Sequence, residues 1–476
     1  MSGAGSHPIG TAAPPLHRAY RLQQESGGIQ LPMQPVVLPG HTPEQMVDKV
    51  CALVLRERAF FWWWVLLLPF LALFAIGLCS ALWLFYKGPG VWGVDWPVMW
   101  GFALVNYVWW IAIASGGTFV SALFFLTRSE WRASINRTAE TMLLFAATAA
   151  GIYPIMHLGR PWFAYWLFPY PDTMALWPQF RSPLFWDFAA LFTYVVASIL
   201  YWYFGLIPDF ASVRDRARRR RAQILYGALA LGFRGSRTAW RHFRATYAVM
   251  AALMAPLVVS VHSFVGNDFS GAQTTGWHST EFPPFFVFGA LHSGFAVVVF
   301  LIIPLRRLYR LEAYVTARHI EVLGRLMIAT TFAMAYAYLM DAFNSYYSQD
   351  RFEHSYASAA MFGPYGWVFW GKLGLNILLT QLLWFRAVRL NQIAMMLISF
   401  GVIIGMWFER FQIVITSLSH TKMPSSWGYF HATFWDWTLM AGTIGMFFSG
   451  FLIAIRIVPA ISMYEVAELM QKKSGT

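Results

Sequence analysis

The chain has 476 residues, of which 58% are hydrophobic, 18% aromatic and only 12% charged. This composition excludes an ordinary soluble protein and is typical of a polytopic membrane protein. Cys51 and Cys79 are too few to ligate an iron–sulfur cluster, and the sequence lacks the Cys-x-x-Cys-His motif of covalent haem. The net charge of +13 does not indicate nucleic acid, because ten of the 35 basic residues lie between Arg214 and Arg244, beside a membrane helix.

Residues 1–45 are rich in Pro, Gly, Gln and Ser and lack the apolar core of a signal peptide. We expect an extended cytoplasmic tail. Residues 46–60 follow as a lead-in to the membrane domain, which we place at 61–458, with a cytoplasmic tail at 459–476. Within Pro43 to Arg58 the apolar residues have helical spacing, which is compatible with an amphipathic helix on the membrane surface or with a simple polar lead-in.

Ten stretches reach the ~20 residues that a helix needs to cross the hydrocarbon core. They are Phe61–Phe85, Val98–Leu126, Thr141–Leu158, Pro183–Ile207, Ala245–Val265, Phe285–Leu305, Leu323–Phe343, Gly366–Phe385, Ile393–Phe411 and Phe434–Val458. Most basic residues fall in the tails and in the loops after the even-numbered spans. The positive-inside rule therefore predicts that both termini are cytoplasmic and that the loop after span three faces outward.

The stretch Ser115-Gly116-Gly117-Thr118 in the second span consists of small residues. Small residues allow neighbouring helices to approach closely, so helix packing is the simpler interpretation. A local helix break that leaves room for a lipid-soluble tail is the alternative.

Spans three and four bring ionisable residues together at one membrane face. The third span ends in His157, and Gly159 and Pro161 follow as a helix-terminating glycine and proline. Ser182-Pro183 is typical of an N-cap followed by proline at the first helical position, which places Asp187 about one turn inside the next helix. We therefore expect His157 and Asp187 at similar depth on adjacent helices, beside a loop rich in tryptophan and tyrosine.

These motifs carry a family resemblance. They are Ser115-Gly-Gly-Thr-Phe-Val-Ser-Ala, Asn136-Arg137-Thr-Ala-Glu140, His157-Leu-Gly-Arg-Pro, Phe168-Pro-Tyr-Pro and Arg181-Ser-Pro-Leu-Phe-Trp-Asp187. Together they resemble the NrfD-like family, the membrane subunits of polysulfide reductase, from about Arg56 to Arg456. The His-Leu-Gly-Arg-Pro loop is characteristic of the alternative-complex-III branch, and within the family the chain most resembles the larger NrfD-like subunit of that complex.

The resemblance implies an all-α fold of two four-helix bundles flanked by the first and last spans. It also implies a quinol pocket near the outer face, carried over onto His157 and Asp187 and, with less support from the residues themselves, onto Asp268. Quinol oxidation releases two protons from an apolar ring, which suits a carboxylate and an imidazole between flat aromatic walls. The imidazole titrates near pH ~6.5 in its unperturbed state.

Arg160 and Arg181 lie on the face where the charge rule expects few basic residues. Structural pairing, for example with Asp187, is the first interpretation, and a lipid phosphate, a partner subunit or the quinol site are alternatives. We expect Asp172 only to cap the loop.

Other ionisable residues fall in the outer half of their spans or just beyond: His262, Asp268, His292, Asp341, Lys372, Glu409 and Asp436. Each costs at least ~2.5 kcal/mol at the membrane centre on insertion scales, so each needs a partner or a function. His262 and His292 on adjacent spans could be axial haem ligands, but the resembling family carries no haem in this subunit. Asp341, preceded by Tyr336, Tyr338 and Thr330, could form a proton route, although small polar groups in helices are usually satisfied locally.

The sequence thus predicts an all-α membrane subunit of a quinol:electron-acceptor oxidoreductase in the cytoplasmic membrane of a bacterium. We expect it to bind quinol, in particular menaquinol, near the outer face, and we expect no metal, haem or cluster on this chain. The implied partners are an iron–sulfur subunit on the outer face, multihaem and monohaem cytochromes, a second NrfD-like subunit and lipids, with no nucleic acid. An ion-translocating or scaffolding subunit without a quinone is the rival interpretation, and the intramembrane acids suit both.

Overall fold

The computed structural model describes residues 34–167 and 183–474. Every regular element in these ranges is helical, which confirms the predicted all-α class. Apolar runs of this length form helices in a membrane because a helix satisfies the backbone N–H and C=O groups within the segment, and the hydrocarbon core offers these groups no other partners. Arg181 and Asp172 lie outside the described residues, as does most of the aromatic-rich loop after span three.

Nine helices in the described ranges are long and apolar enough to cross a membrane. They are α3 (Phe61–Lys87), α4–α5 (Phe102–Leu126, with a π-helical turn at Phe119–Leu123), α6 (Asn136–His157), α7 (Pro183–Arg216), α9 (Arg237–Ser270), α10 (Phe282–Leu308), α11 (Ala317–Tyr347), α15–α16 (Gln392–Ser419) and α17 (Phe434–Ile457). Each lies on one of the ten predicted stretches, and the chain is a multi-pass integral membrane protein.

The tenth predicted stretch is also helical, but it changes helix type twice. It comprises α13 (Gly366–Leu373), a π-helical segment η5 (Gly374–Leu378) and a 3-10 segment η6 (Leu379–Trp384). Because the segments follow one another directly, they form one continuous helical path, although none alone is long enough to span a membrane.

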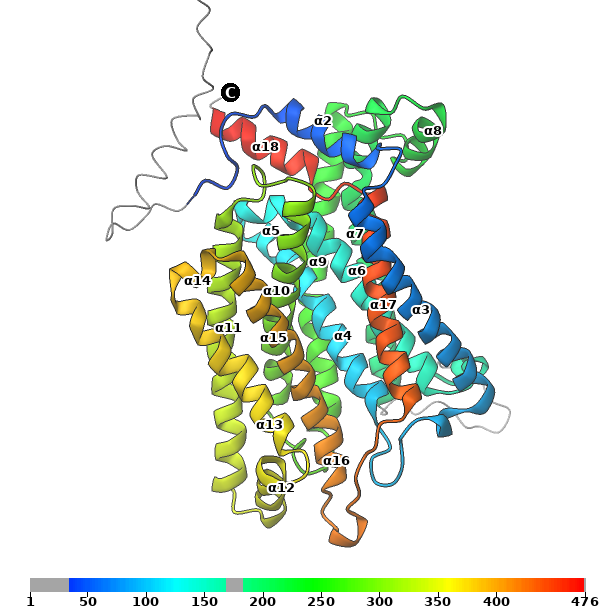
Figure 1. Cartoon of the computed structure of the whole chain (residues 1–476), viewed down its shortest axis with the longest axis vertical. Helices are drawn as coiled ribbons and strands as arrows, with labels where there is room; N and C mark the ends of the chain where they lie inside the picture. The colour runs from blue at the N-terminus through cyan, green and yellow to red at the C-terminus, as the bar shows by residue number, and fades with distance from the viewer. Residues whose placement is uncertain (1–33, 168–182, 475–476) are drawn as a thin grey trace, which may run out of the picture. The chain divides into compact units, whose positions relative to one another are not determined.

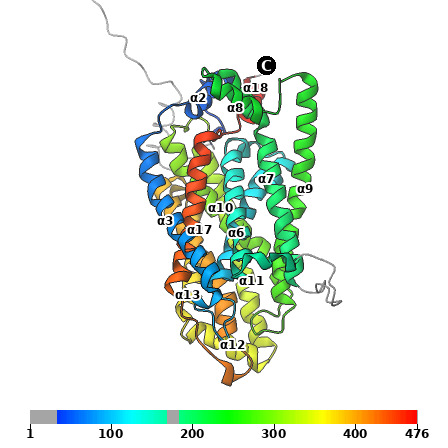
Figure 2. The same ribbon diagram turned by 90° about the vertical axis from the view of Figure 1, so that its right-hand side faces the viewer.

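The spans group into two four-helix bundles, as the family resemblance implies. The first bundle contains α4, α6, α7 and α9, and the second contains α10, α11, α13 with its continuation, and α15. Figure 1 shows α4 and α10 side by side at the centre, and in the turned view of Figure 2 α7 and α9 of the first bundle lie next to each other. Helices α3 and α17 pack against each other and lie beside the first bundle at α6.

The two bundles meet where α4 crosses α10. A Cβ on Gly116 would overlap the Cα of Gly294, and a Cβ on Gly294 would overlap the Cα of Gly116. On the other side of α4, a Cβ on Gly117 would lie 2.5 Å from the carbonyl oxygen of Ala139 in α6. The predicted packing role of this small-residue stretch is therefore present, and the π-helical turn follows it directly.

Short helices cover the two ends of the bundles. One end, here called the α18 end, carries α2 (Pro43–Val54), α8 (Arg220–Leu229) and α18 (Met463–Ser474). The opposite end, here called the α12 end, carries α12 (Arg351–Phe362). Helix α2 lies within the stretch with helical spacing and begins at the N-cap Thr42. Helix α18 packs on α2 inside what the sequence indicated only as a tail.

A buried ionic network fixes the start of α6 at the α18 end. The Arg137 guanidinium lies 2.5 Å from a carboxylate oxygen of Glu140 and 2.8 Å from one of Asp209 in α7, and all three side chains are fully buried. Asp209 also accepts a hydrogen bond from the backbone N–H of Met463, which begins α18. The Asn136-Arg137-Thr-Ala-Glu140 motif therefore joins α6, α7 and α18.

Candidate functional site

The end of α6 presents His157 at the α12 end. Helix α6 ends at His157, and Gly159 adopts a left-handed φ of 66°, as expected for a helix-terminating glycine. A Cβ at Gly159 would overlap the ring of Pro89 in the short 3-10 helix η1 (Pro89–Val91). The turn after α6 is therefore pressed against the α3–α4 connection.

Two tryptophans from that connection enclose the His157 ring. Trp100 stacks on it with ring centroids 4.5 Å apart and planes 14° apart. Trp92 also stacks on the His157 ring, with ring centroids 6.0 Å apart and planes 20° apart. His157 Nδ1 is buried and has no hydrogen-bond partner among the described residues. The imidazole is therefore held flat by aromatic rings while one ring nitrogen remains available to a ligand.

Asp187 lies near the start of α7 and is bound by a tyrosine of α4. The Tyr107 hydroxyl lies 2.8 Å from both carboxylate oxygens of Asp187. Tyr107 is buried and Asp187 is half-buried. Asp268 in α9 lies close enough for its carboxylate to repel that of Asp187. Three helices of the first bundle thus contribute polar groups to one region.

The connection that carries Trp92 and Trp100 is itself anchored to α17. Asp436 Oδ2 accepts hydrogen bonds of 2.8 Å from the backbone N–H groups of Gly93 and Thr433. Asp436 is the acidic member of a capping box at the start of α17. This acid therefore has a structural role, because it positions the loop that encloses His157.

The remaining residues predicted for this site differ in how they are placed. His157 and Asp187 lie on packed neighbouring helices at the α12 end, but no hydrogen bond between their side chains is found within the described residues. Arg160 is exposed and lies in the turn after α6. Arg181, also predicted to pair or bind quinol, falls in the undescribed part of that loop.

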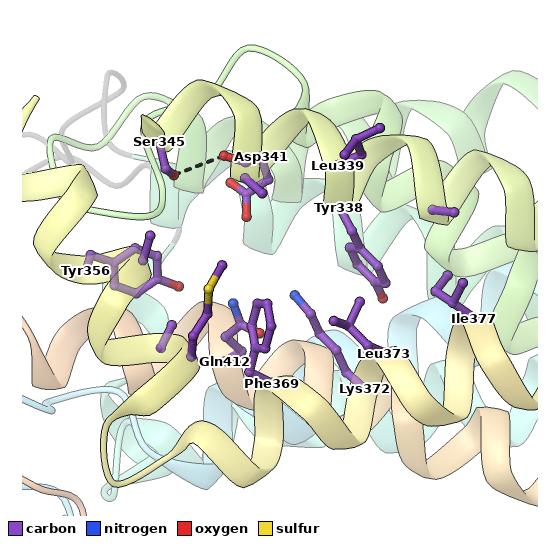
Figure 3. A pocket seen from close by; sticks show the side chains of 15 residues that line it. Tyr338, Leu339, Asp341, Ser345, Tyr356, Phe369, Lys372, Leu373, Ile377 and Gln412 are labelled. Atoms are coloured by element: carbon purple, nitrogen blue, oxygen red, sulfur yellow. Dashed lines mark hydrogen bonds between the residues drawn. The ribbon is translucent and has the colours of Figure 1, made fainter. Parts of the chain in front are cut away.

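The residues of the suggested proton route do not all face one space. Asp341 and Tyr338 line a cavity in the second bundle, shown in Figure 3. Thr330 contacts His292 instead, with its hydroxyl 2.9 Å from Nδ1. The Tyr336 side chain is 64% exposed on the outside of the bundle.

Charged side chains surround the inner wall of that cavity. The Tyr338 hydroxyl donates a hydrogen bond to Glu409 and accepts one of 3.0 Å from the Asn376 amide. Glu409 in turn lies 2.6 Å from the guanidinium of Arg410, and both residues are buried. At the start of α10, just outside the membrane-spanning segment, burial and the nearby charge of Asp341 raise the pKa of Glu281 to about 7.

The two histidines considered as haem ligands bond to neighbouring hydroxyl groups. His262 Nδ1 lies 3.1 Å from the Ser115 hydroxyl of α4, and His292 Nδ1 bonds to Thr330 of α11. Both imidazoles are buried. These contacts join α9 to α4 and α10 to α11, which is a helix-packing role.

Sequence reasoning missed the aromatic partners of both proton-exchanging groups. Tyr107 lies 80 positions from Asp187 in the chain, and no spacing rule connects them. Trp92 and Trp100 lie in a connection whose sequence indicates only an aromatic-rich interface. A tyrosine hydroxyl inside an apolar span was the one indication available, because buried tyrosines normally find a hydrogen-bond partner.

The fold and these side chains define a class: a polytopic α-helical membrane protein with a polar, aromatic-lined site within one of its bundles. The profile of the family described as polysulphide reductase, NrfD, matches residues 91–421, well over half of the chain. The chain therefore belongs to the NrfD family, as the motifs had indicated.

A protein of Halobacterium salinarum, described as a membrane subunit of dimethyl sulfoxide reductase, is similar to part of the chain. The two are 27% identical over 202 residues, which is 42% of each chain. The chain thus matches less than half of the length of that relative.

Proposed function

We propose that the chain is the quinol-binding membrane subunit of a quinol-oxidising electron-transfer complex of the alternative complex III type. The observation that carries this proposal is the pairing of Asp187 with the Tyr107 hydroxyl, together with an imidazole on the neighbouring helix that Trp92 and Trp100 enclose. A quinol needs such a combination of proton acceptors and flat apolar walls.

In this mechanism one quinol hydroxyl donates its proton to the Asp187 carboxylate, and the other donates to the free nitrogen of His157. Tyr107 holds the carboxylate in place, and the tryptophans orient His157. The two electrons leave the ring for an iron–sulfur centre on a partner subunit, and the two protons pass to water at the outer face. The α18 end then faces the cytoplasm, in agreement with its arginine-rich surface.

The chain's resemblance to the alternative-complex-III branch supports the rest of the assembly. The proposed partners are an iron–sulfur subunit at the outer face, multihaem and monohaem cytochromes, and a second NrfD-like subunit. Menaquinol is the proposed electron donor. Catalysis belongs to this assembly, since the chain supplies binding and proton transfer while its partners accept electrons.

Replacing Asp187 with Asn tests the site, because the substitution keeps size and hydrogen bonding but removes the proton acceptor. We expect quinol oxidation by the assembled complex to fall on the order of 10²-fold, the scale of a positioned general base. His157→Ala should also weaken binding of a quinol-site inhibitor. Asp215→Asn, at an exposed position of the α18 end, is the matched control. Near-normal turnover by an assembled Asp187→Asn complex would contradict the proposal.

A second candidate function is ion translocation through the second bundle, and the buried charges Asp341, Lys372, Glu409 and Arg410 favour it. Proton conduction needs groups that exchange protons inside the membrane, and such groups are otherwise costly there. Proton release per quinol, measured in proteoliposomes, separates the two functions. If the second bundle translocates protons, Asp341→Asn should lower the number of protons released per quinol without changing the rate of quinol oxidation.

A further inference from the structure

A cavity of about 270 Å³ lies inside the second bundle near the α12 end, bounded by α11, α12, α13 and the π-helical segment η7 (Gln412–Thr416). Figure 3 shows Asp341 of α11 and Lys372 of α13 pointing into it from opposite sides. Apolar side chains such as Phe369 and Ile377 form much of the remaining wall. The cavity therefore combines two opposite charges with flat apolar surfaces.

The charges of Asp341 and Lys372 attract each other across the cavity, but the two side chains form no ion pair within bonding distance. Lys372 is only 5% exposed, and its ammonium forms no hydrogen bond or ion pair with any described residue. It lies 4.3 Å from the ring centroid of Tyr338 and 5.2 Å from that of Phe369, so cation–π contacts aim it at the cavity. The Asp341 carboxylate is likewise unbonded within the described chain. Charges held apart in this way favour a ligand that bonds to both.

Helix α12 covers the cavity at the α12 end, and another wall of the cavity faces the outside of the bundle. Tyr356, Ala357 and Ala360 of α12 are buried and line the cavity at the α12 end. Leu339 of α11 also lines it, yet 63% of its surface is exposed on the lipid-facing side of the bundle. A ligand that reaches the cavity from the bilayer must be lipid-soluble.

The cavity occupies a place in the second bundle that matches the His157–Asp187 site in the first. The second helix of each bundle carries an Arg and a Glu at its second and fifth residues, Arg137 and Glu140 in α6 and Arg318 and Glu321 in α11. Each of these helices then runs to the α12 end, where it and the start of the third helix supply the polar groups.

The helices that carry the acid and the base are exchanged between the two sites. In the first bundle the base is on the second helix and the acid, Asp187, on the third. In the second bundle the acid, Asp341, is on the second helix and the base, Lys372, on the third. Each site also includes a buried tyrosine, Tyr107 or Tyr338.

We propose that this cavity is a second quinone-binding pocket. One ring oxygen accepts a hydrogen bond from Lys372, and the opposite hydroxyl of the quinol donates to Asp341, while the ring lies against Phe369 and Leu339. The proposal rests on the proposed function only for the use of a quinone pool, and it is a binding site without a redox step. Water alone fits less well, because each water needs about two to four polar partners and most of the wall is apolar.

Photo-crosslinking of the intact complex in nanodiscs with an azido-naphthoquinone, followed by peptide mapping, tests the pocket. We expect crosslinks on both the α6–α7 and the α11–α13 peptides. Lys372→Met should reduce the α11–α13 crosslink about tenfold, the effect of losing one charged hydrogen bond, and leave the α6–α7 crosslink unchanged. Lys422→Met, in an exposed loop, is the control.

Ala335→Leu provides a second variant, because the larger side chain at this lining position occupies part of the cavity without changing charge, and it should also remove the α11–α13 crosslink. Absence of that crosslink in the unaltered complex, or its survival in both variants, would overturn the second pocket. If instead the proposed function of the His157–Asp187 site is wrong, the Asp187→Asn complex keeps normal turnover while the α11–α13 crosslink persists.

Discussion

The Tyr107 hydroxyl lies 2.8 Å from both oxygens of the Asp187 carboxylate, so a tyrosine of α4 fixes the acid of α7. Hydrogen bonds to a charged group contribute about 1.5–3 kcal/mol. Tyr107→Phe should therefore lower the kcat of quinol oxidation by ~10- to 100-fold while the complex still assembles. Steady-state kinetics checks this, with Tyr226→Phe at the α18 end as control. Equal rates for both variants would show that Asp187 needs no support from Tyr107.

Arg137 should be required for a stable fold. Arg137→Met leaves the buried carboxylates of Glu140 and Asp209 without their cation, and breaking a buried pair costs about 3–5 kcal/mol. Thermal unfolding of the solubilised complex should shift clearly downward or the yield should collapse. Arg219→Met removes an ion pair with Glu57 in which both side chains are mostly exposed, and should change little. An unchanged melting temperature for Arg137→Met would contradict the structural role.

The crossing of the two bundles should tolerate no side chain. Gly116→Ala places a methyl group on the backbone of α10 at Gly294, so the helices must separate. Overpacking of this kind costs about 1–3 kcal/mol or more. We expect loss of assembled complex on size-exclusion chromatography. Gly374→Ala is the matched control, because open space surrounds a Cβ at that membrane position.

Stability should depend on pH through Glu281. Burial and the Asp341 charge raise the pKa of Glu281 from 4.5 to about 7, so the folded protein binds a proton more tightly than the unfolded chain. The resulting stabilisation is complete below pH ~4.5 and is lost as pH rises to about 7. Melting temperatures between pH 5 and 8 should therefore fall for the native protein and fall less for Glu281→Gln. Identical pH profiles would show that other groups dominate.

Membrane orientation is tested by labelling single cysteines. In a background with Cys51 and Cys79 replaced by Ser, a cysteine at the exposed Gly90 should react with an impermeant maleimide from outside. A cysteine at Arg219 should react only after the membrane is opened, because the α18 end is basic. The reverse pattern would invert the orientation and place the His157 site at the cytoplasmic face.

Local patterns of the sequence predicted the spans and the ends of several helices. The end of α6 at His157, with Gly159 in the left-handed conformation, and the start of α7 at Pro183 follow from residues adjacent in the chain. Such features depend on local backbone preferences, which composition and spacing record. The fold class was accessible for the same reason, since long apolar runs leave few other solutions in a membrane.

Contacts between distant segments were not predictable in the same way. Arg137 and Asp209 lie 72 positions apart, and Tyr107 and Asp187 lie 80 apart. Their pairing depends on how the packed helices are rotated about their axes, which local sequence patterns do not specify. Helix α18 was also missed, because its mixed polar sequence shows an apolar face only once α2 is present to cover it.

The packing of α3 on α17 has a consequence for biogenesis. The backbones of Gly77 and Gly442 approach so closely that a Cβ on either would overlap the other, and the Trp63 indole donates a 2.8 Å hydrogen bond to the Leu452 carbonyl, so the earliest span relies on one of the latest. The ribosome releases α17 only after more than 300 further residues have followed α3. Until then α3 lies in the bilayer without the helix it mainly packs against, and an insertase or chaperone can bind it during this interval. A chain truncated before Phe434 should leave that helix stranded and expose it to membrane quality-control proteases.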